Sequence, residues 1–203
     1  MPLLHVCKRW RRIIFASPQH LQLLLPVLRC GNSNRSPVKK SLDVWSTLPF
    51  KLHYNHSRDM DVRQDIIAAL KHHNRIAEIT FDKVPSSVFE KISAFMQEPL
   101  PFLTRLKIDG VIDFERKIVL VFPKTFLGGS TPRLQDCSLR GFMFPALPTL
   151  LISARHLNYL CLSDIPVSGF TSPEVMANCL STLPNLHHLT FGIQLPHGYH
   201  DSS

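Results

Sequence analysis

A row of aspartates gives the first hint of chemistry, because its spacing is close to that of a calcium-binding loop. Asp59, Asp61 and Asp65 would occupy the first, third and seventh positions of such a loop. The sixth position needs a glycine for its sharp turn, and the twelfth needs a bidentate glutamate. Gln64 and Leu70 stand at those two positions instead. The sequence therefore excludes a calcium loop of this type.

Two further motifs are too incomplete for catalysis. Asp109, Asp113 and Glu115 form an acidic cluster, which a solvated turn after a strand explains. The Gly-Gly-Ser run at residues 128–130 lacks the lysine and the spacing of a phosphate-binding loop, and no Gly-x-Ser-x-Gly elbow occurs. Neither motif supplies a nucleophile with a base, so neither predicts an active site.

The histidines include two adjacent pairs, at residues 72–73 and 187–188. Neighbouring side chains diverge on a helix and on a strand, so neither pair can aim both rings at one metal ion. The first pair suits the C-terminus of a helix, where positive charge is favourable. Together with the incomplete motifs, this predicts a protein that is not an enzyme and that holds no metal and no cofactor.

The composition indicates a folded chain with reduced thiols. Its 203 residues are 44% hydrophobic, which suits one or two domains with a hydrophobic core. No apolar run approaches the roughly 18 residues that span a bilayer, so we expect no membrane partner. The five cysteines form no Cys-x-x-Cys pair and follow no secretory signal. This usage favours the cytoplasm or the nucleus.

The net charge of +8 is concentrated at one end of the chain. Residues 1–42 contain eight basic residues and no acidic ones, which leaves 15 basic and 15 acidic residues in 43–203. A neutral body with one basic end does not resemble a protein that follows a phosphate backbone along its length. We therefore expect no nucleic-acid partner.

A repeated pattern, Leu-x-x-Leu-x-Leu, predicts the elements that position the polar residues. It is clearest at residues 157–162, and its middle apolar position recurs after 27, 31, 23 and 29 residues. Such an interval is typical of a solenoid, in which each unit gives one short strand and a return segment. The repeats resemble degenerate leucine-rich repeats. The middle positions are Ile79, Leu106, Cys137, Leu160 and Leu189.

We therefore expect an α/β fold, a leucine-rich-repeat-like solenoid with one curved parallel sheet and irregular helical return segments. The run at 21–25, centred on Leu23, and the alternating segment at 48–54, centred on Leu52, extend the period toward the N-terminus. The sheet would then hold seven strands. The polar stretch at 30–41 between these two strands is predicted to be a loop.

Helical return segments are predicted from capping signals. Asp65 can cap one helix, Ser87 with Glu90 forms a capping box for a second, and Ser172 followed by Pro173 opens a third. A shorter helix is expected at 145–154, and a glycine turn at 128–129.

The residues between the apolar positions of each strand should face outward on the concave side of the solenoid. They form a mixed polar surface that includes Ala77 and Glu78, and Tyr159 is the expected anchor because interface hot spots favour aromatic residues. The alternative is an ordinary solvated sheet with no ligand. The candidate binding residues are Arg105, Lys107, Gln135, Asp136, Asn158, Tyr159, His187 and His188.

Residues 2–15 predict an amphipathic helix with a basic face, which Ser17-Pro18 ends. The stretch Val6-Cys7-Lys8-x-Trp10-Arg11, with the Ser-Pro pair and Leu21 behind it, resembles the C-terminal half of an F-box. The Leu-Pro-x-Glu opening of that module is absent. A segment like that at 45–49 also occurs in fungal families with F-boxes and degenerate repeats. The residues that match the adaptor-binding stretch are Leu4, Val6, Cys7, Trp10 and Ile13.

The resemblance implies a substrate-recruiting subunit of a cullin-type ubiquitin ligase. The F-box would bind the Skp-type adaptor, and the repeats would bind a protein substrate that the sequence does not name. The chain is then either a truncated receptor or one whose remnant helix only caps the repeats. The implied domains are a partial F-box-like cap (1–20), a linker with the first irregular strands (21–60), degenerate leucine-rich repeats (61–195) and a disordered tail (196–203).

Two other interpretations of the N-terminal helix stay open. It could simply cap one end of a freestanding repeat scaffold with no ligase role, because every solenoid needs a polar cover at its ends. Alternatively, its basic, acid-free and amphipathic character fits a mitochondrial presequence. A presequence does not need the Cys7 and Trp10 motif.

Overall fold

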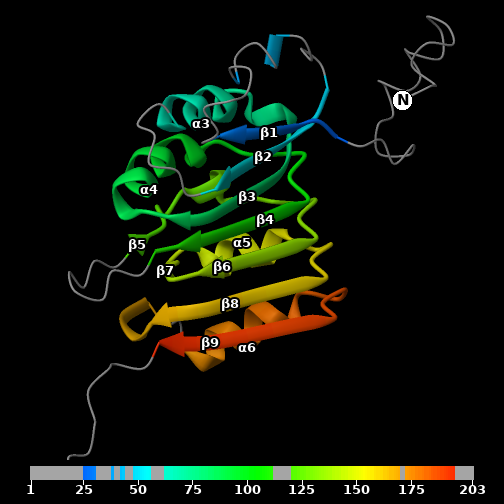
Figure 1. The fold of residues 1–203 in the computed structure, drawn as a ribbon. Helices are drawn as coiled ribbons and strands as arrows, with labels where there is room; N and C mark the ends of the chain where they lie inside the picture. The colour runs from blue at the N-terminus through cyan, green and yellow to red at the C-terminus, as the bar shows by residue number, and fades with distance from the viewer. Residues whose placement is uncertain are drawn as a thin grey trace, which may run out of the picture.

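The structure is a computed structural model that describes residues 25–30, 38, 42–43, 48–55, 62–111, 120–169 and 172–194. The predicted cap at 1–20 and the predicted tail at 196–203 lie outside these residues. So do the five adaptor-binding candidates Leu4, Val6, Cys7, Trp10 and Ile13. The described part is an α/β fold built on a parallel sheet of seven strands (Figure 1).

The seven strands follow one another across the sheet, and every neighbouring pair is parallel. A parallel neighbour needs a return segment, so each strand is followed by a crossover to the start of the next. In spatial order the strands are β1 (Val27–Cys30), β2 (Phe50–Asn55), β3 (Ile76–Val84), β4 (Arg105–Gly110), β6 (Asp136–Arg140), β8 (Tyr159–Pro166) and β9 (His188–Gln194). A separate two-stranded sheet pairs β5 (Leu120–Val121) with β7 (Phe142–Met143).

The register confirms the predicted alignment of the five repeats. Ile79 pairs with Leu106, the row continues through Cys137 and Leu160, and it ends at Leu189. Each of the first four side chains is fully buried. The predicted spacing therefore places one apolar residue of each unit directly against the next.

The prediction for the first strand was wrong. Leu52 does extend the row, but its partner in β1 is Leu28 and not Leu23. The exposed and buried residues of β1 alternate, with Leu28 and Cys30 buried. Cys30, which the sequence placed in a loop, therefore belongs to the core. The leucine run at 21–25 misled the prediction because consecutive leucines carry no period-two signal.

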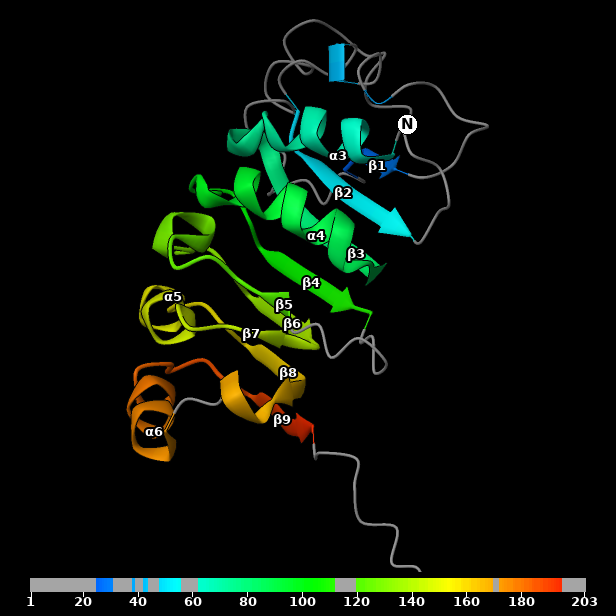
Figure 2. The ribbon, with the colours of Figure 1, turned by 90° about the vertical axis from the view of Figure 1, so that its left-hand side faces the viewer.

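The return segments lie along one face of the sheet, so the other face is uncovered by the described helices (Figure 2). Inward side chains of the strands pack against them, and a buried leucine or isoleucine contributes roughly 1.5–3 kcal/mol. The α-helices are α3 (Val62–Leu70), α4 (Ser86–Ser93), α5 (Leu147–Ser153) and α6 (Pro173–Ser181). Short 3-10 turns occur at η2 (His73–Arg75), η3 (Ala94–Gln97), η4 (Phe126–Gly129) and η5 (Val167–Gly169).

The predicted helices are present, but two of the three predicted caps were wrong. Helix α3 begins at Val62, so Asp65 lies in its first turn. Helix α4 begins after Pro85, with no capping side-chain bond from Ser87. The Pro85 carbonyl instead accepts the amides of Val88 and the next residue at 3.0 Å. Only the Ser172 cap of α6 is confirmed, where its hydroxyl accepts the Val175 amide at 3.4 Å.

A cluster of phenylalanines fills the space between the sheet and the return segments in the longest unit. Phe122 is at its centre and is 1% exposed. Its ring lies 4.3–5.0 Å from four others, measured between centroids. Aromatic pairs at such separations add about 0.5–1.5 kcal/mol beyond their burial. The four neighbours are Phe89, Phe126, Phe142 and Phe144.

The first prediction concerns this cluster. Phe122→Ala should lower the free energy of unfolding by about 3–5 kcal/mol, because it leaves a cavity that the surrounding rings cannot fill. The control is Phe95→Ala, since Phe95 is 40% exposed and should lose no more than about 1 kcal/mol. Urea unfolding followed by circular dichroism measures both changes. Equal losses would contradict the cluster as the centre of the core.

Candidate functional site

The outward face of the sheet carries two straight rows of side chains, because all neighbouring strands share one register. Successive outward residues on a strand are two positions apart, so each row takes one residue from each strand. The first row is Lys51, Glu78, Arg105, Asp136, Tyr159 and His188. The second row is His53, Thr80, Lys107, Ser138, Cys161 and Thr190.

Charges alternate in sign along the first four positions of the first row. Lys51 Nζ lies 2.7 Å from Glu78 Oε1. Arg105 lies between two acids, with Nη1 3.7 Å from Glu78 and Nη2 2.8 Å from Asp136. Its Nε also donates to Asp136 at 2.9 Å, and this hydrogen bond raises the pKa of Arg105. The row is a continuous chain of ion pairs across four strands.

Further ion pairs lie beside these rows. Lys107 Nζ donates to Asp82 at 2.7 Å, and Arg140 Nε donates to Asp164 at 2.6 Å and lies 3.9 Å from Asp109. Pairs as exposed as these contribute about 0–1 kcal/mol each, so they do little for stability. Their effect is to neutralise one another. Every lysine and arginine named here has an acidic neighbour within 4 Å.

The first row ends in an aromatic pair. The rings of Tyr159 and His188 stack with centroids 4.6 Å apart and planes 3° apart. Tyr159 is 37% exposed, and the neighbouring Cys161 raises the pKa of its phenol. The phenol therefore stays un-ionised and available as a donor. On the other side, His188 Nε2 lies 3.0 Å from Thr190 Oγ1.

A shallow open depression joins the charged and the aromatic parts of this face. Its lining brings together a phenol, a serine hydroxyl, two cations and a carboxylate above one apolar side chain. Such a mixture can form hydrogen bonds and stacking contacts with another surface, and it contains no nucleophile activated by a base. The lining residues are Arg105, Leu106, Lys107, Asp136, Ser138 and Tyr159.

The structure brings the predicted binding residues together on this face. Arg105, Lys107, Asp136, Tyr159 and His188 are in the two rows. The remaining three precede their strands at the same edge of the sheet, where they are exposed and joined by backbone hydrogen bonds from one unit to the next. Those three residues are Gln135, Asn158 and His187.

One outward position was predicted wrongly. Ala77 is 7% exposed, because it lies beside a register shift between β2 and β3. Its carbonyl accepts both the amide and the hydroxyl of Thr104, at 2.8 and 3.0 Å, so the next unit covers it. Its small side chain belongs to the edge of the core and not to the binding face.

Three charged residues of this face were missed as site residues: Lys51, Asp82 and Arg140. Lys51 precedes Leu52 just as Glu78 precedes Ile79, so the repeat pattern contained the signal. Asp82 and Arg140 lie beyond the six-residue motif, on strands that run longer than the motif requires. Extending the alternation by two residues would have found both.

The described residues contain no group of three or more histidine, cysteine or acidic side chains that could hold a metal ion. Within the same residues, no helix has the length and hydrophobicity needed to cross a membrane. The chemistry on the outward face is therefore that of ion pairs, hydrogen bonds and aromatic contacts.

The second prediction tests which residues point inward. Burial raises the pKa of the Cys137 thiol to about 12, whereas Cys161 on the next strand lies partly exposed in the second row. A maleimide reagent at neutral pH should therefore modify Cys161 much faster than Cys137. Peptide mapping by mass spectrometry gives the extent at each site. Cys161→Ser is the control for peptide assignment, and modification of both thiols at similar rates would contradict the alternation.

Comparison with known proteins does not add a relative. Neither protein-family models nor curated proteins nor solved structures give a match to this chain. The F-box resemblance of the N-terminal stretch therefore stays an expectation from the sequence. The function has to be inferred from the geometry of the outward face.

Proposed function

We propose that this chain is a non-enzymatic protein-interaction module whose outward sheet face binds another protein. The observation that carries the proposal is the pair of in-register rows across the uncovered face of the sheet. They offer a continuous polar surface with one exposed aromatic stack and no enclosed reaction site. In the finer proposal, this face is the concave wall of a leucine-rich-repeat-like solenoid.

The charges of this face favour a protein partner over a polyanion. A phosphate backbone binds through unpaired lysines and arginines that displace its counterions. Here Lys51, Arg105, Lys107 and Arg140 already lie against carboxylates. A protein surface can instead match an alternating pattern pair by pair, which contributes more to specificity than to affinity.

Tyr159 is the proposed anchor of the interface. Hot spots are enriched in tyrosine, tryptophan and arginine, and they become strong when neighbouring contacts exclude water. Tyr159 borders the depression, stacks on His188 and is followed in the row by Asp136 and Arg105. A partner that covers this part of the sheet would bury the phenol together with the ion pair.

The cellular role that we propose is substrate recruitment in a cullin-type ubiquitin ligase, in the cytoplasm or nucleus. The support is the F-box-like stretch with Cys7 and Trp10 ahead of the repeats. In this arrangement the N-terminal stretch would contact the Skp-type adaptor and the sheet face would select the protein substrate. Ubiquitin transfer would be performed by other subunits.

The third prediction tests adaptor binding. A purified Skp-type adaptor should co-purify with the chain, extended upstream in its reading frame where needed to complete the F-box, and Trp10→Ala should abolish this retention. Trp45→Ala is a matched control, because Trp45 is the second of only two tryptophans and lies in the predicted linker. If neither the given nor the extended chain retains the adaptor, the freestanding scaffold replaces the ligase role. Import into mitochondria with loss of the N-terminal segment would favour the presequence.

The fourth prediction tests the outward face independently of the adaptor. Proteins cross-linked to the chain in cells should decrease at least about tenfold with Tyr159→Ala, the loss expected for a hot-spot aromatic residue. Val121→Ala serves as the control, because Val121 is also exposed, at 49%, but lies in the small β5–β7 sheet. Quantitative mass spectrometry compares the two variants. Recovery of the same proteins at the same level with Tyr159→Ala would contradict this interface.

A further inference from the structure

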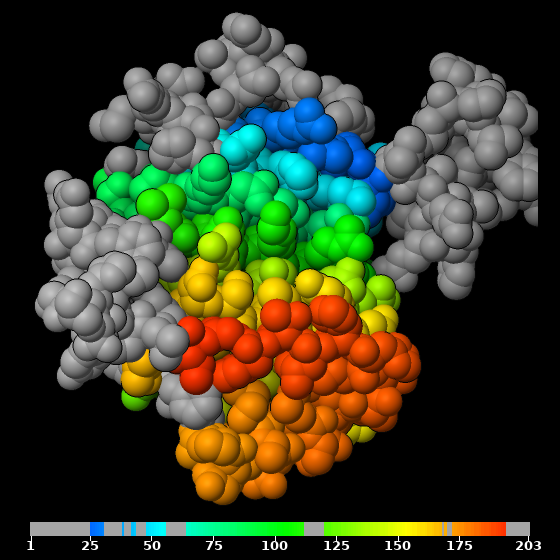
Figure 3. Space-filling view, turned by 60° about the horizontal axis from the view of Figure 1, so that its bottom comes forward, coloured from blue at the N-terminus to red at the C-terminus, as the bar shows by residue number. Residues whose placement is uncertain are grey.

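The last strand of the sheet exposes residues that every earlier unit buries. In β9, Leu189 is 45% exposed, Phe191 is 37% exposed and Ile193 is 42% exposed. Figure 3 shows β9 and α6 at this end of the molecule, with no other described element over them. The register partners of these residues in β8, Leu160, Leu162 and Ile165, are 0%, 2% and 8% exposed.

The first end of the sheet is closed by the chain itself. Leu28 and Cys30 of β1 are 2% and 3% exposed. Val38 and Leu42, from the segment that follows β1, are equally buried and belong to the same core cluster. The molecule therefore has one covered end and one end where the apolar layer continues to the surface.

The edge of β9 has none of the features that keep sheet edges apart. Edge strands usually carry lysine, proline, inward charges or bulges that prevent pairing. The sequence of β9 is His-Leu-Thr-Phe-Gly-Ile-Gln, without lysine, proline or any acid. The His188 amide donates to the Asn158 carbonyl beside β8. Amide direction alternates along a strand, so the Leu189 amide points away from β8, toward the edge.

We propose that two copies of this chain associate through β9 to form a closed dimer. Antiparallel pairing about a two-fold axis at Phe191 places Leu189 of one copy opposite Ile193 of the other. Directly opposed residues in an antiparallel pair point to the same face, so the two apolar layers become continuous. On the outward face, Thr190 lies opposite Gly192, and no like charges meet.

The interface also needs α6. A standard protein interface uses about 20–30 residues on each side, and β9 supplies seven. A two-fold axis perpendicular to the sheet keeps both helical layers on one side, so the two α6 helices approach each other. There Val175 is 42% exposed, and Met176 packs only partly against the core.

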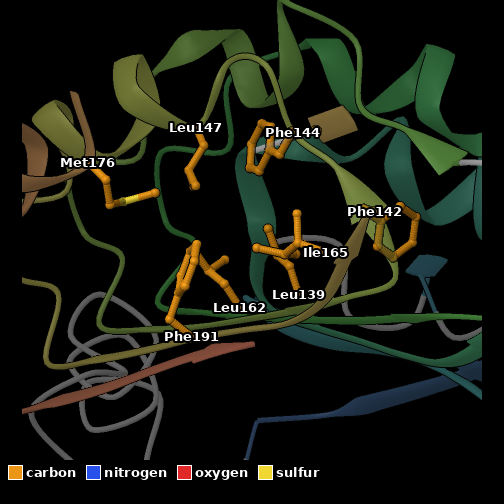
Figure 4. A pocket seen from close by; sticks show the side chains of 9 residues that line it. Leu139, Phe142, Phe144, Leu147, Leu162, Ile165, Met176 and Phe191 are labelled. Atoms are coloured by element: carbon orange, nitrogen blue, oxygen red, sulfur yellow. The ribbon is translucent and has the colours of Figure 1, made fainter. Parts of the chain in front are cut away.

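An apolar hollow behind β9 is a second sign that this end is incompletely packed. It lies between the sheet and the helices, and Met176 and Phe191 of the last unit contribute to its wall (Figure 4). The remaining lining is apolar as well, so water gains no hydrogen bonds there. Ordering of α6 against its counterpart would tighten this layer.

The geometry selects a dimer over a filament. Head-to-tail stacking needs two complementary ends, and the first end is already covered by Val38 and Leu42. Pairing of β9 with its own copy uses the same surface twice and leaves no free edge. The assembly therefore closes at two chains.

The fifth prediction measures this association with the full chain by sedimentation velocity over a wide range of concentration. We expect a species of twice the 23.1 kDa chain mass. Leu189→Asp should raise the dissociation constant at least about tenfold, because it places a charge opposite an apolar residue. Val121→Asp is the matched control at 49% exposure and should leave the constant unchanged. Circular dichroism checks that both variants fold.

Three results would overturn the proposal. The full chain could stay a monomer at every concentration. A chain that ends at residue 194 could dimerise while the full chain does not, which would make residues 195–203 the occupant of the edge. Equal weakening by Leu189→Asp and Val121→Asp would place the contact elsewhere. None of these results depends on whether the outward face binds a protein substrate.

Discussion

The burial of one apolar side chain per strand between its neighbours is the constraint on which the rest of this structure depends. Ile79 is fully buried because Leu52 lies on one side and Leu106 on the other. Neither strand could hide its apolar face alone, so the units are stable only when they stack. Stacking fixes the register, and a period of two then sends every alternate residue to the outward face.

The binding face is therefore a by-product of the core. The ion pairs from Lys51 to Asp136 join strands that are far apart in sequence, and they form because the inward residues beneath them are already in register. Since these charges satisfy one another, the aromatic pair at the end of the row is the part of the face with the most to gain from a partner. Tyr159 loses exposed apolar surface on binding and no ion pair has to break.

The sequence predicted the parts of the fold that repeat and failed where a signal occurs once. Five positions from Ile79 to Leu189 could be aligned because each supports the others. Leu23 was chosen within a uniform leucine run, and the register chose Leu28. Asp65 and Ser87 have residue types that cap helices, but tertiary packing starts both helices earlier. The ion pairs could be found only after the register placed neighbouring strands side by side.

Nearest-neighbour stacking also explains why recognition and assembly can be separate in one small sheet. A change to an outward residue such as Arg105 alters contacts with the strands on either side, and it leaves the inward row beneath it unchanged. The end of the sheet obeys a different rule, because Leu189 has a partner on one side only. Its exposure cannot be relieved by any change within its own unit. The face can therefore vary with its ligand, whereas the end needs a cover of fixed apolar character.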